Sequence, residues 1–173
     1  DKKADADQSI AEAITTFTLT QDSAGIHIKC GHGGSHGSSN GGESGCESLT
    51  IKVPSGSVAQ PANVQAACGN GDVTISGIIG SVKGRNNDGL GLIDASVTPT
   101  KGSTVDIQGG GDITLRLPAT FAADTITLSG GTQDTSAFPD VKSGKGFGNP
   151  GDGAKSITLV TSKSDGVLKL TKQ

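Results

Sequence analysis

A short pattern recurs at a fixed interval along the chain, and it constrains the fold more than any other feature. Gly71-Asp-Val-Thr-Ile75 returns forty residues later as Gly111-Asp-Ile-Thr-Leu115, and Gly91-Leu-Ile-Asp94 lies midway between them. Val73, Ile93 and Ile113 are therefore spaced by twenty residues. A unit of this length, with two short strands and tight glycine turns, is typical of proteins that stack one repeat upon the next.

The apolar residues of the repeat alternate with polar ones, which is the pattern of strands with one buried face. We expect Val73, Ile75, Ile93, Ile113 and Leu115 to form the core of the stack. Looser copies follow at 124–128, 155–159 and 165–170. We therefore expect the equivalent residues of successive repeats to lie on top of one another.

Short runs rich in Val, Ile, Thr and Leu are separated throughout by Gly, Asp, Asn and Ser, which predicts many strands joined by turns. The chain has 28 Gly, four Phe and no Trp, Tyr or Met, so its core is built from small aliphatic side chains. Long loops are expected at Gly31–Gly45 and Gly130–Gly153. The predicted strands are Thr15–Thr20, Gly25–Cys30, Ser48–Val53, Val64–Ala67, Asp72–Ser76, Ser81–Lys83, Gly91–Ala95, Thr104–Gln108, Asp112–Leu117, Asp124–Ser129, Ser156–Thr161 and Val167–Thr171.

These strands predict an all-β fold. We expect residues 10–173 to form a single-domain β-solenoid or β-roll of short stacked strands, preceded by a polar tether at residues 1–9. The alternative is a β-sandwich, because meandering hairpins would show similar strands. A sandwich would not require the twenty-residue spacing, so the spacing favours the solenoid.

Three segments in order resemble a family of bacterial adhesin-like proteins with β-strand repeats. They are Asn70-Gly-Asp-Val-Thr-Ile-Ser-Gly77, Gly110-Gly-Asp-Ile-Thr-Leu-Arg-Leu-Pro118 and Ala119-Thr-Phe-Ala-Ala-Asp124, and the likeness extends from about Leu49 to Leu170. The function of that family is poorly known. The resemblance implies a solenoid-like fold, a location in the cell envelope and no catalytic residues to transfer.

Charge and hydropathy exclude several classes of partner. The net charge of −3 and the lack of a basic stripe argue against nucleic acid. No run of about 18 apolar residues is present, so we expect no membrane-spanning helix. Because the sequence starts at Asp1 without Met, we expect a processed, exported protein of the periplasm or cell surface, with a lipid-anchored precursor left open.

Cys30 and Cys46 enclose the glycine- and serine-rich stretch 31–45, and we predict a disulfide between them. Such a bond suits an oxidising compartment and would stabilise the fold by about 3 kcal/mol in the chain-entropy model. The alternatives are three reduced thiols, or a pairing that involves Cys68.

A metal site in the same region is the weaker interpretation. His27, His32 and His36 lie near the cysteines and two glutamates, but their spacing matches no established zinc motif. Calcium is a second candidate, since Asp72, Asp112 and Asp152 each follow a glycine. An Asp in that position is more often a turn residue whose carboxylate bonds its own backbone. We predict no resident metal or cofactor.

No motif of catalysis is recognisable, and we predict that the protein is not an enzyme. A nucleophile elbow, a phosphate-binding loop, a dinucleotide fingerprint and a His-Glu-x-x-His pair are all missing from the sequence. The sequence thus favours a non-catalytic, adhesin-like structural or interaction module with a protein or cell-surface partner. One alternative is a ligand- or metal-binding sensor built on residues 27–47. A less favoured alternative is a carbohydrate-active β-helix enzyme. The grooves of such enzymes normally carry several basic side chains and aromatic platforms, whereas this chain has two arginines and no Trp or Tyr.

Overall fold

The computed structural model describes residues 17–22, 25–30, 54–68, 72–86, 91–149 and 151–173. The chain falls into two compact units, Asp1–Lys52 and Val53–Gln173. In the first, β1 (Phe17–Asp22) and β2 (Gly25–Cys30) form an antiparallel pair. Every regular element among the described residues is a strand, which confirms the all-β prediction. The tether at 1–9 and the single domain over 10–173 stay predictions.

The described residues of the second unit form ten strands, and most of these strands alternate buried and half-exposed residues. From residue 104 onward their bounds agree with the sequence prediction to within one residue, apart from two short strands that it missed, whereas the strand predicted at Gly91–Ala95 lies two to three residues later, at Ile93–Thr98. The strands are β3 (Ala62–Cys68), β4 (Val73–Asn86), β5 (Ile93–Thr98), β6 (Thr104–Gly109), β7 (Ile113–Leu117), β8 (Ala123–Ser129), β9 (Thr132–Asp134), β10 (Lys145–Phe147), β11 (Ser156–Thr161) and β12 (Val167–Lys172).

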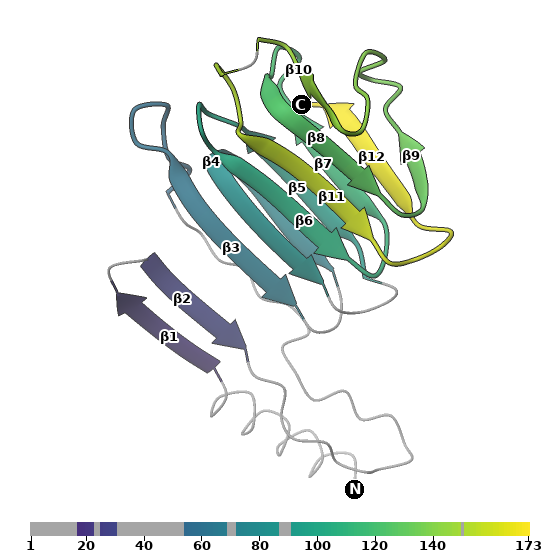
Figure 1. The fold of residues 1–173 in the computed structure, drawn as a ribbon. Helices are drawn as coiled ribbons and strands as arrows, with labels where there is room; N and C mark the ends of the chain where they lie inside the picture. The colour runs from purple at the N-terminus through teal and green to yellow at the C-terminus, as the bar shows by residue number, and fades with distance from the viewer. Residues whose placement is uncertain (1–16, 23–24, 31–53, 69–71, 87–90, 150) are drawn as a thin grey trace, which may run out of the picture. The chain divides into compact units, whose positions relative to one another are not determined.

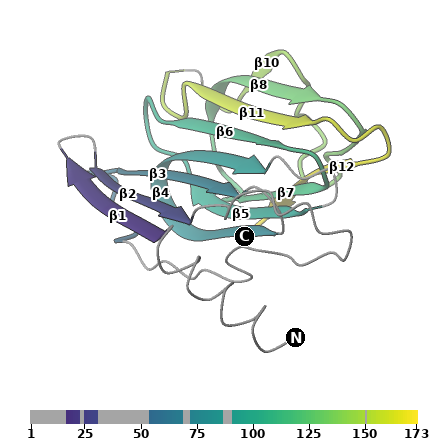
Figure 2. The same cartoon turned by 90° about the horizontal axis from the view of Figure 1, so that it is seen from below.

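These strands make one curled sheet with two wings that share the long strand β4 (Figures 1 and 2). The β6 wing has the order β3-β4-β6-β11-β8-β10, and the β7 wing has the order β4-β5-β7-β12-β9. All the pairs are parallel except that of β10 with β8, which is antiparallel. The inner faces of the wings enclose the core, so a Cβ on Gly109 in one wing would lie 3.1 Å from Cδ1 of Ile93 in the other.

The strand registers carry apolar residues from one strand to the next. In the β7 wing, Val73 pairs with Ile93 and Ile93 pairs with Ile113, at the twenty-residue spacing seen in the sequence. Leu168 of β12 continues the row beyond Ile113. The β6 wing has a matching row, Val82, Val105, Ile157 and Ile126. Most of these side chains are fully buried, and the core therefore consists of aligned aliphatic rows.

The strand β4 bends from one wing into the other at its glycines. The sequence predicts separate strands at Asp72–Ser76 and Ser81–Lys83, but β4 runs through both. Gly77 and Gly80 have φ of 69° and 135°, which favour glycine. A Cβ on Gly80 would also lie 2.2 Å from the carbonyl oxygen of Ala62. These glycines let the chain turn the corner without leaving the sheet.

The segment 130–153, predicted as a long loop, contains β9, β10 and part of an aromatic cluster. Phe121 stacks on Phe147 at 4.6 Å between ring centroids and meets the edge of Phe138 at 5.1 Å. The Nζ atom of Lys172 lies 5.8 Å from the centre of the Phe138 ring. The loop prediction was wrong because such short, polar strands have no apolar alternation; they form by pairing with β12 and β8.

Candidate functional site

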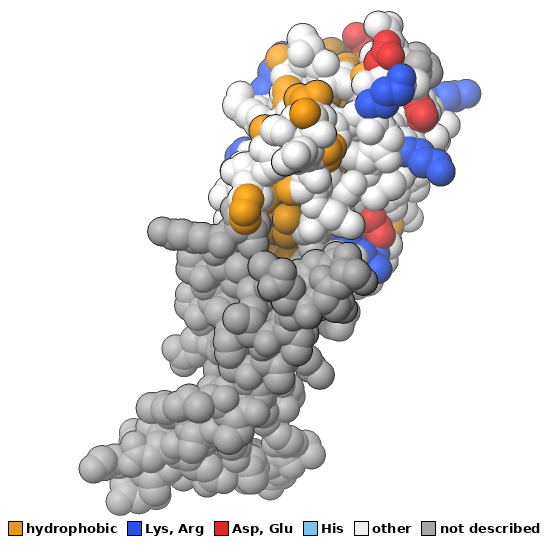
Figure 3. Space-filling view, turned by 90° about the vertical axis from the view of Figure 1, so that its left-hand side faces the viewer, with side chains coloured by type: hydrophobic (Ala, Val, Ile, Leu, Met, Phe, Trp, Pro, Cys, Tyr) orange, Lys and Arg blue, Asp and Glu red, His pale blue; other side chains and the backbone are white. Residues whose placement is uncertain are grey.

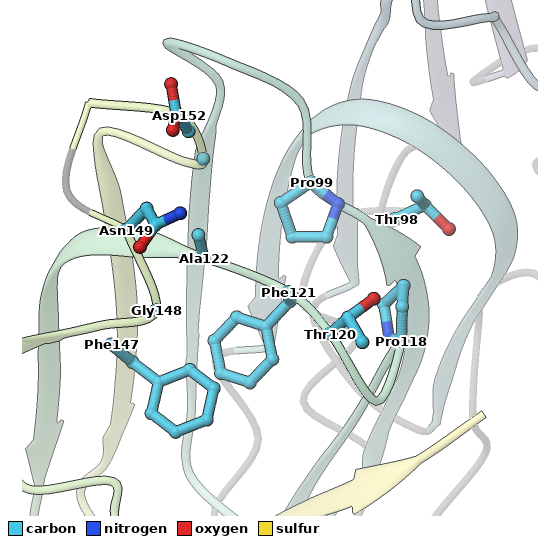
Figure 4. A pocket seen from close by; sticks show the side chains of 11 residues that line it. Thr98, Pro99, Pro118, Thr120, Phe121, Ala122, Phe147, Gly148, Asn149 and Asp152 are labelled. Atoms are coloured by element: carbon cyan, nitrogen blue, oxygen red, sulfur yellow. The ribbon is translucent and has the colours of Figure 1, made fainter.

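A hollow of about 520 Å³ lies at the corner where the β7 wing passes into the β6 wing. Three loops line it: the ends of β5 and β7 and the segment between β10 and β11 (Figure 4). Its lining is nearly evenly divided between polar and apolar surface, and it includes an amide and a carboxylate. The lining residues are Thr98, Pro99, Pro118, Thr120, Phe121, Ala122, Phe147, Gly148, Asn149, Asp152 and Gly153.

Two prolines help to set the position of the hollow. Pro118 directly follows β7, and Pro99 directly follows β5, which pairs with β7 in the same wing. Proline has no backbone N–H to donate to a neighbouring strand, so both ladders stop here and the chain turns. In Figure 4 the ring of Pro99 lies above Phe121 and that of Pro118 lies to its side, and Phe121 stacks on Phe147.

Backbone hydrogen bonds hold the three loops together. The N–H of Gly102 donates to the carbonyl of Gly153 at 2.9 Å, and the N–H of Ala154 donates to that of Ala122 at 2.9 Å. The carboxylate of Asp124 accepts from the N–H of Gly151 at 2.6 Å. Because the loops are fixed to one another, the hollow is already formed before anything binds, as is usual for ligand-binding sites.

Asn149 and Asp152 supply the polar chemistry of the rim. Both side chains are exposed, and the backbone N–H of Asp152 donates to the carbonyl of Asn149 at 3.2 Å. An amide and a carboxylate beside apolar side chains can hold a group that has one apolar face and hydrogen-bond donors at its edge. The sequence pattern indicated Asp152 only as a calcium candidate and gave no signal for the other lining residues.

The Gly-Asp pairs of the repeat have a structural role different from the one expected. The carboxylate of Asp72 accepts from the N–H of Leu92 at 2.8 Å, and that of Asp112 accepts from the N–H of Val167 at 2.9 Å. Each bond therefore joins one repeat to the next instead of closing a turn on its own backbone, which corrects the prediction. Among the described residues, no group of three or more His, Cys, Asp and Glu could hold a metal.

The residues of the predicted metal site and disulfide lie largely outside the described residues. His27 and Cys30 are in β2, where their backbones pair with Thr20 and Phe17. His32, His36 and Cys46 are outside the described residues. The disulfide and the less favoured metal site therefore stay predictions.

Both arginines of the chain are engaged on the outer faces of the wings. Arg85 pairs with Asp106 of the neighbouring strand, and Arg116 pairs with Asp94 in the same diagonal arrangement. Burial raises the pKa of Asp106, but the hydrogen bonds from Arg85 and Gln108 outweigh it, so that the pKa lies below its ordinary value. These ion pairs fix the outer faces and do not converge on the hollow.

In the view of Figure 3, apolar side chains lie among polar atoms, and charged side chains lie at both borders of the described part, most of them at one border. Val58 and Leu92 are the large apolar residues exposed within the described ranges, at 77% and 47%. Within those ranges, too, no helix has the length and hydropathy required to cross a bilayer. We therefore take the hollow as the candidate site of the second unit.

No family model, curated protein or solved structure matches the chain. The hollow and the outer faces must therefore be interpreted from their own chemistry.

Proposed function

We propose that this protein is a non-catalytic, adhesin-like interaction module of the cell envelope, built on a β-solenoid-like scaffold. The observation that carries the proposal is the run of parallel strands in matched register, which places identical positions of successive repeats in rows. Such stacking makes a stiff support, and its corners can carry loops that vary independently of the core.

The hollow is the part of this scaffold that we assign to the partner. Its loops are tied by backbone bonds at Gly102–Gly153 and Ala122–Ala154, and its floor rests on the phenylalanine cluster. A preformed site of this kind loses little conformational entropy on binding. The exposed Asn149 and Asp152 would give it selectivity through hydrogen bonds.

Binding of the full chain to intact bacterial cells and to isolated envelope fractions tests this function. The variant Asn149→Ala/Asp152→Ala removes the polar rim and leaves the core untouched. Asp140→Ala is the matched control, because Asp140 is an exposed turn residue that does not line the hollow. We expect saturable binding that the double variant weakens about tenfold, the loss of one or two hydrogen bonds, and that the control preserves.

Absence of saturable binding would contradict the interaction role. Equal binding by the unchanged protein, the double variant and the control would show that the hollow is not the binding site.

The proposed extracytoplasmic location has a separate test. Fractionation of the producing cells should recover the protein outside the cytoplasm, and its intact mass without reductant should be two hydrogens below that of the reduced chain. Recovery in the cytoplasm with three free thiols would contradict the location.

A further inference from the structure

The charge of the hollow limits the kind of ligand that it can bind. Among the described residues that line it, Asp152 is the one charged side chain, and none is basic. The two arginines of the chain are paired with Asp106 and Asp94 on the outer faces of the wings. Sites for phosphate or carboxylate groups normally present arginine or lysine. The lining therefore disfavours an anionic ligand and fits a neutral or a cationic one.

The apolar part of the lining is a small platform of rings. The Phe147 ring is half-buried and stacks on Phe121, with 4.6 Å between the ring centroids and 21° between the ring planes. The Phe138 ring lies nearly perpendicular to it, at 6.1 Å and 78°. Phe121 is 5% exposed, so it supports Phe147 and offers little surface of its own. Phe147 and the half-buried rings of Pro99 and Pro118 thus give a ligand a restricted area of fixed apolar surface.

Four side chains around this platform carry hydrogen-bonding groups, and they are Thr98, Thr120, Asn149 and Asp152. Three of them are exposed, and Thr98 is half-buried. None of the four side chains forms a hydrogen bond or an ion pair with another described residue. The carboxylate of Asp124, by contrast, accepts from the N–H of Gly151 at 2.6 Å and so helps to hold the loop. The polar side chains of the lining are therefore available to a ligand.

The polar groups and the rings lie on different sides of the hollow. Figure 4 shows Asn149 and Asp152 on the left, Pro99 and Pro118 on the right, and the Phe147 ring below Asn149. A ligand in the hollow can therefore touch ring surface with one face and hydrogen-bonding groups with its edge. The volume of about 520 Å³ lies within the range of roughly 300–1,000 Å³ that is usual for small-molecule sites.

We propose that the hollow binds a single neutral sugar unit of a cell-surface glycan. A pyranose ring has a face of C–H groups, which packs on aromatic and proline rings, and hydroxyls around its edge, which both donate and accept. Asn149 and the two threonines can also donate and accept, and Asp152 accepts from hydroxyls. A neutral sugar needs no basic partner. This inference rests on the proposed function, in which the hollow is the site that meets the partner.

Asp152 gives the site a selectivity by charge. Its carboxylate can accept hydrogen bonds from the hydroxyls of a neutral sugar, whereas it repels the carboxylate of an acidic sugar. No basic side chain among the described lining residues offsets that repulsion. We expect a neutral hexose to bind with a Kd on the order of 1 mM, because the hydrogen bonds are few and the apolar area is small. Hexuronates should bind at least about tenfold more weakly.

Titration of the ¹⁵N-labelled full chain, followed in ¹H–¹⁵N correlation spectra at pH 6, tests the inference. The neutral probes are glucose, galactose and mannose, the acidic probes are glucuronate and galacturonate, and the cationic probes are glucosamine and galactosamine. We expect at least one neutral sugar to cause saturable shifts of the backbone amides of Gly148 and Gly153 and of the side-chain amide of Asn149. The same sugar should compete with binding of the chain to envelope fractions.

Three variants separate the roles of the polar side chains. Asn149→Ala should weaken binding of the neutral sugar about fivefold, the loss of one hydrogen bond. Asp152→Asn keeps an acceptor and removes the charge, so the gap between neutral and acidic sugars should narrow to about threefold or less. Asp140→Asn is the matched control, because Asp140 is exposed and does not line the hollow. The control should leave the affinities for neutral and acidic sugars unchanged.

Absence of shifts at these positions with all three neutral sugars at about 50 mM would overturn the inference. Binding of the amino sugars alone, lost in Asp152→Asn, would also overturn it, because the hollow would then be a site for cations. If envelope binding is saturable and no sugar competes with it, the proposed function stands and the sugar is refuted. If a neutral sugar binds as expected and envelope binding is absent, the inference stands and the envelope function fails.

Discussion

Replacement of Ile113 at the centre of the β7 wing should cost more stability than any change on the outer face. Its side chain is fully buried and lies in register between Ile93 and Leu168. Ile113→Val removes one carbon and should cost about 1 kcal/mol. Ile113→Ala removes three, worth about 2.4 kcal/mol in transfer free energy, and the cavity raises the expected loss to about 4 kcal/mol.

The measurement is urea unfolding followed by far-ultraviolet circular dichroism, because the chain has no Trp or Tyr to report by fluorescence. Thr114→Ala is the control, since Thr114 is the next residue and faces outward, half-exposed. It should cost less than about 1 kcal/mol. If Ile113→Ala costs no more than Thr114→Ala, the aligned rows do not hold the fold together.

Three further changes test other contacts. Asp112→Ala should cost about 1–2 kcal/mol in the same urea assay, because the N–H of Val167 loses its acceptor. Gly130→Ala should cost about 3 kcal/mol or more, since its Cβ would lie 2.0 Å from the carbonyl oxygen of Thr161. Gly144→Ala, also at positive φ but in open space, should cost about 1–2 kcal/mol. Equal losses would show that the backbone at Thr161 shifts to make room for the added Cβ. The pKa of Asp106 is lowered in the folded state, so its stabilising effect is present above the unfolded value near 3.8 and is lost as the pH falls through the folded value. Asp106→Asn should therefore lose less stability between pH 6 and pH 3 than the unchanged protein, and identical pH profiles would contradict the role of the ion pair.

The part of the fold that could be predicted from the sequence is the part set by local pattern. Val73, Ile93 and Ile113 share the same alternation and the same glycine-led turns, so their equal spacing is evident in the sequence alone. The bend at Gly77 and Gly80 was predicted as a break, because glycine marks a turn and a bent strand alike.

The order of the strands could not be read from the sequence. Ile157 and Leu168 look like one more copy of the repeat, and nothing in their spacing tells whether that copy is added at the end or inserted. The hollow was missed for a related reason. Its prolines and phenylalanines come from the loop after β5, the loop after β7 and the end of β10, which are far apart in the sequence.

The insertion of β11 and β12 is tested most directly by nuclear Overhauser contacts between methyl groups in the full chain. With Ile, Leu and Val methyls labelled, Ile157 should show cross-peaks to both Val105 and Ile126. Val105 and Ile126 should show none to each other, because two strand spacings separate them by roughly 10 Å. A strong Val105–Ile126 cross-peak, with Ile157 in contact with only one of them, would contradict the strand order on which the scaffold rests.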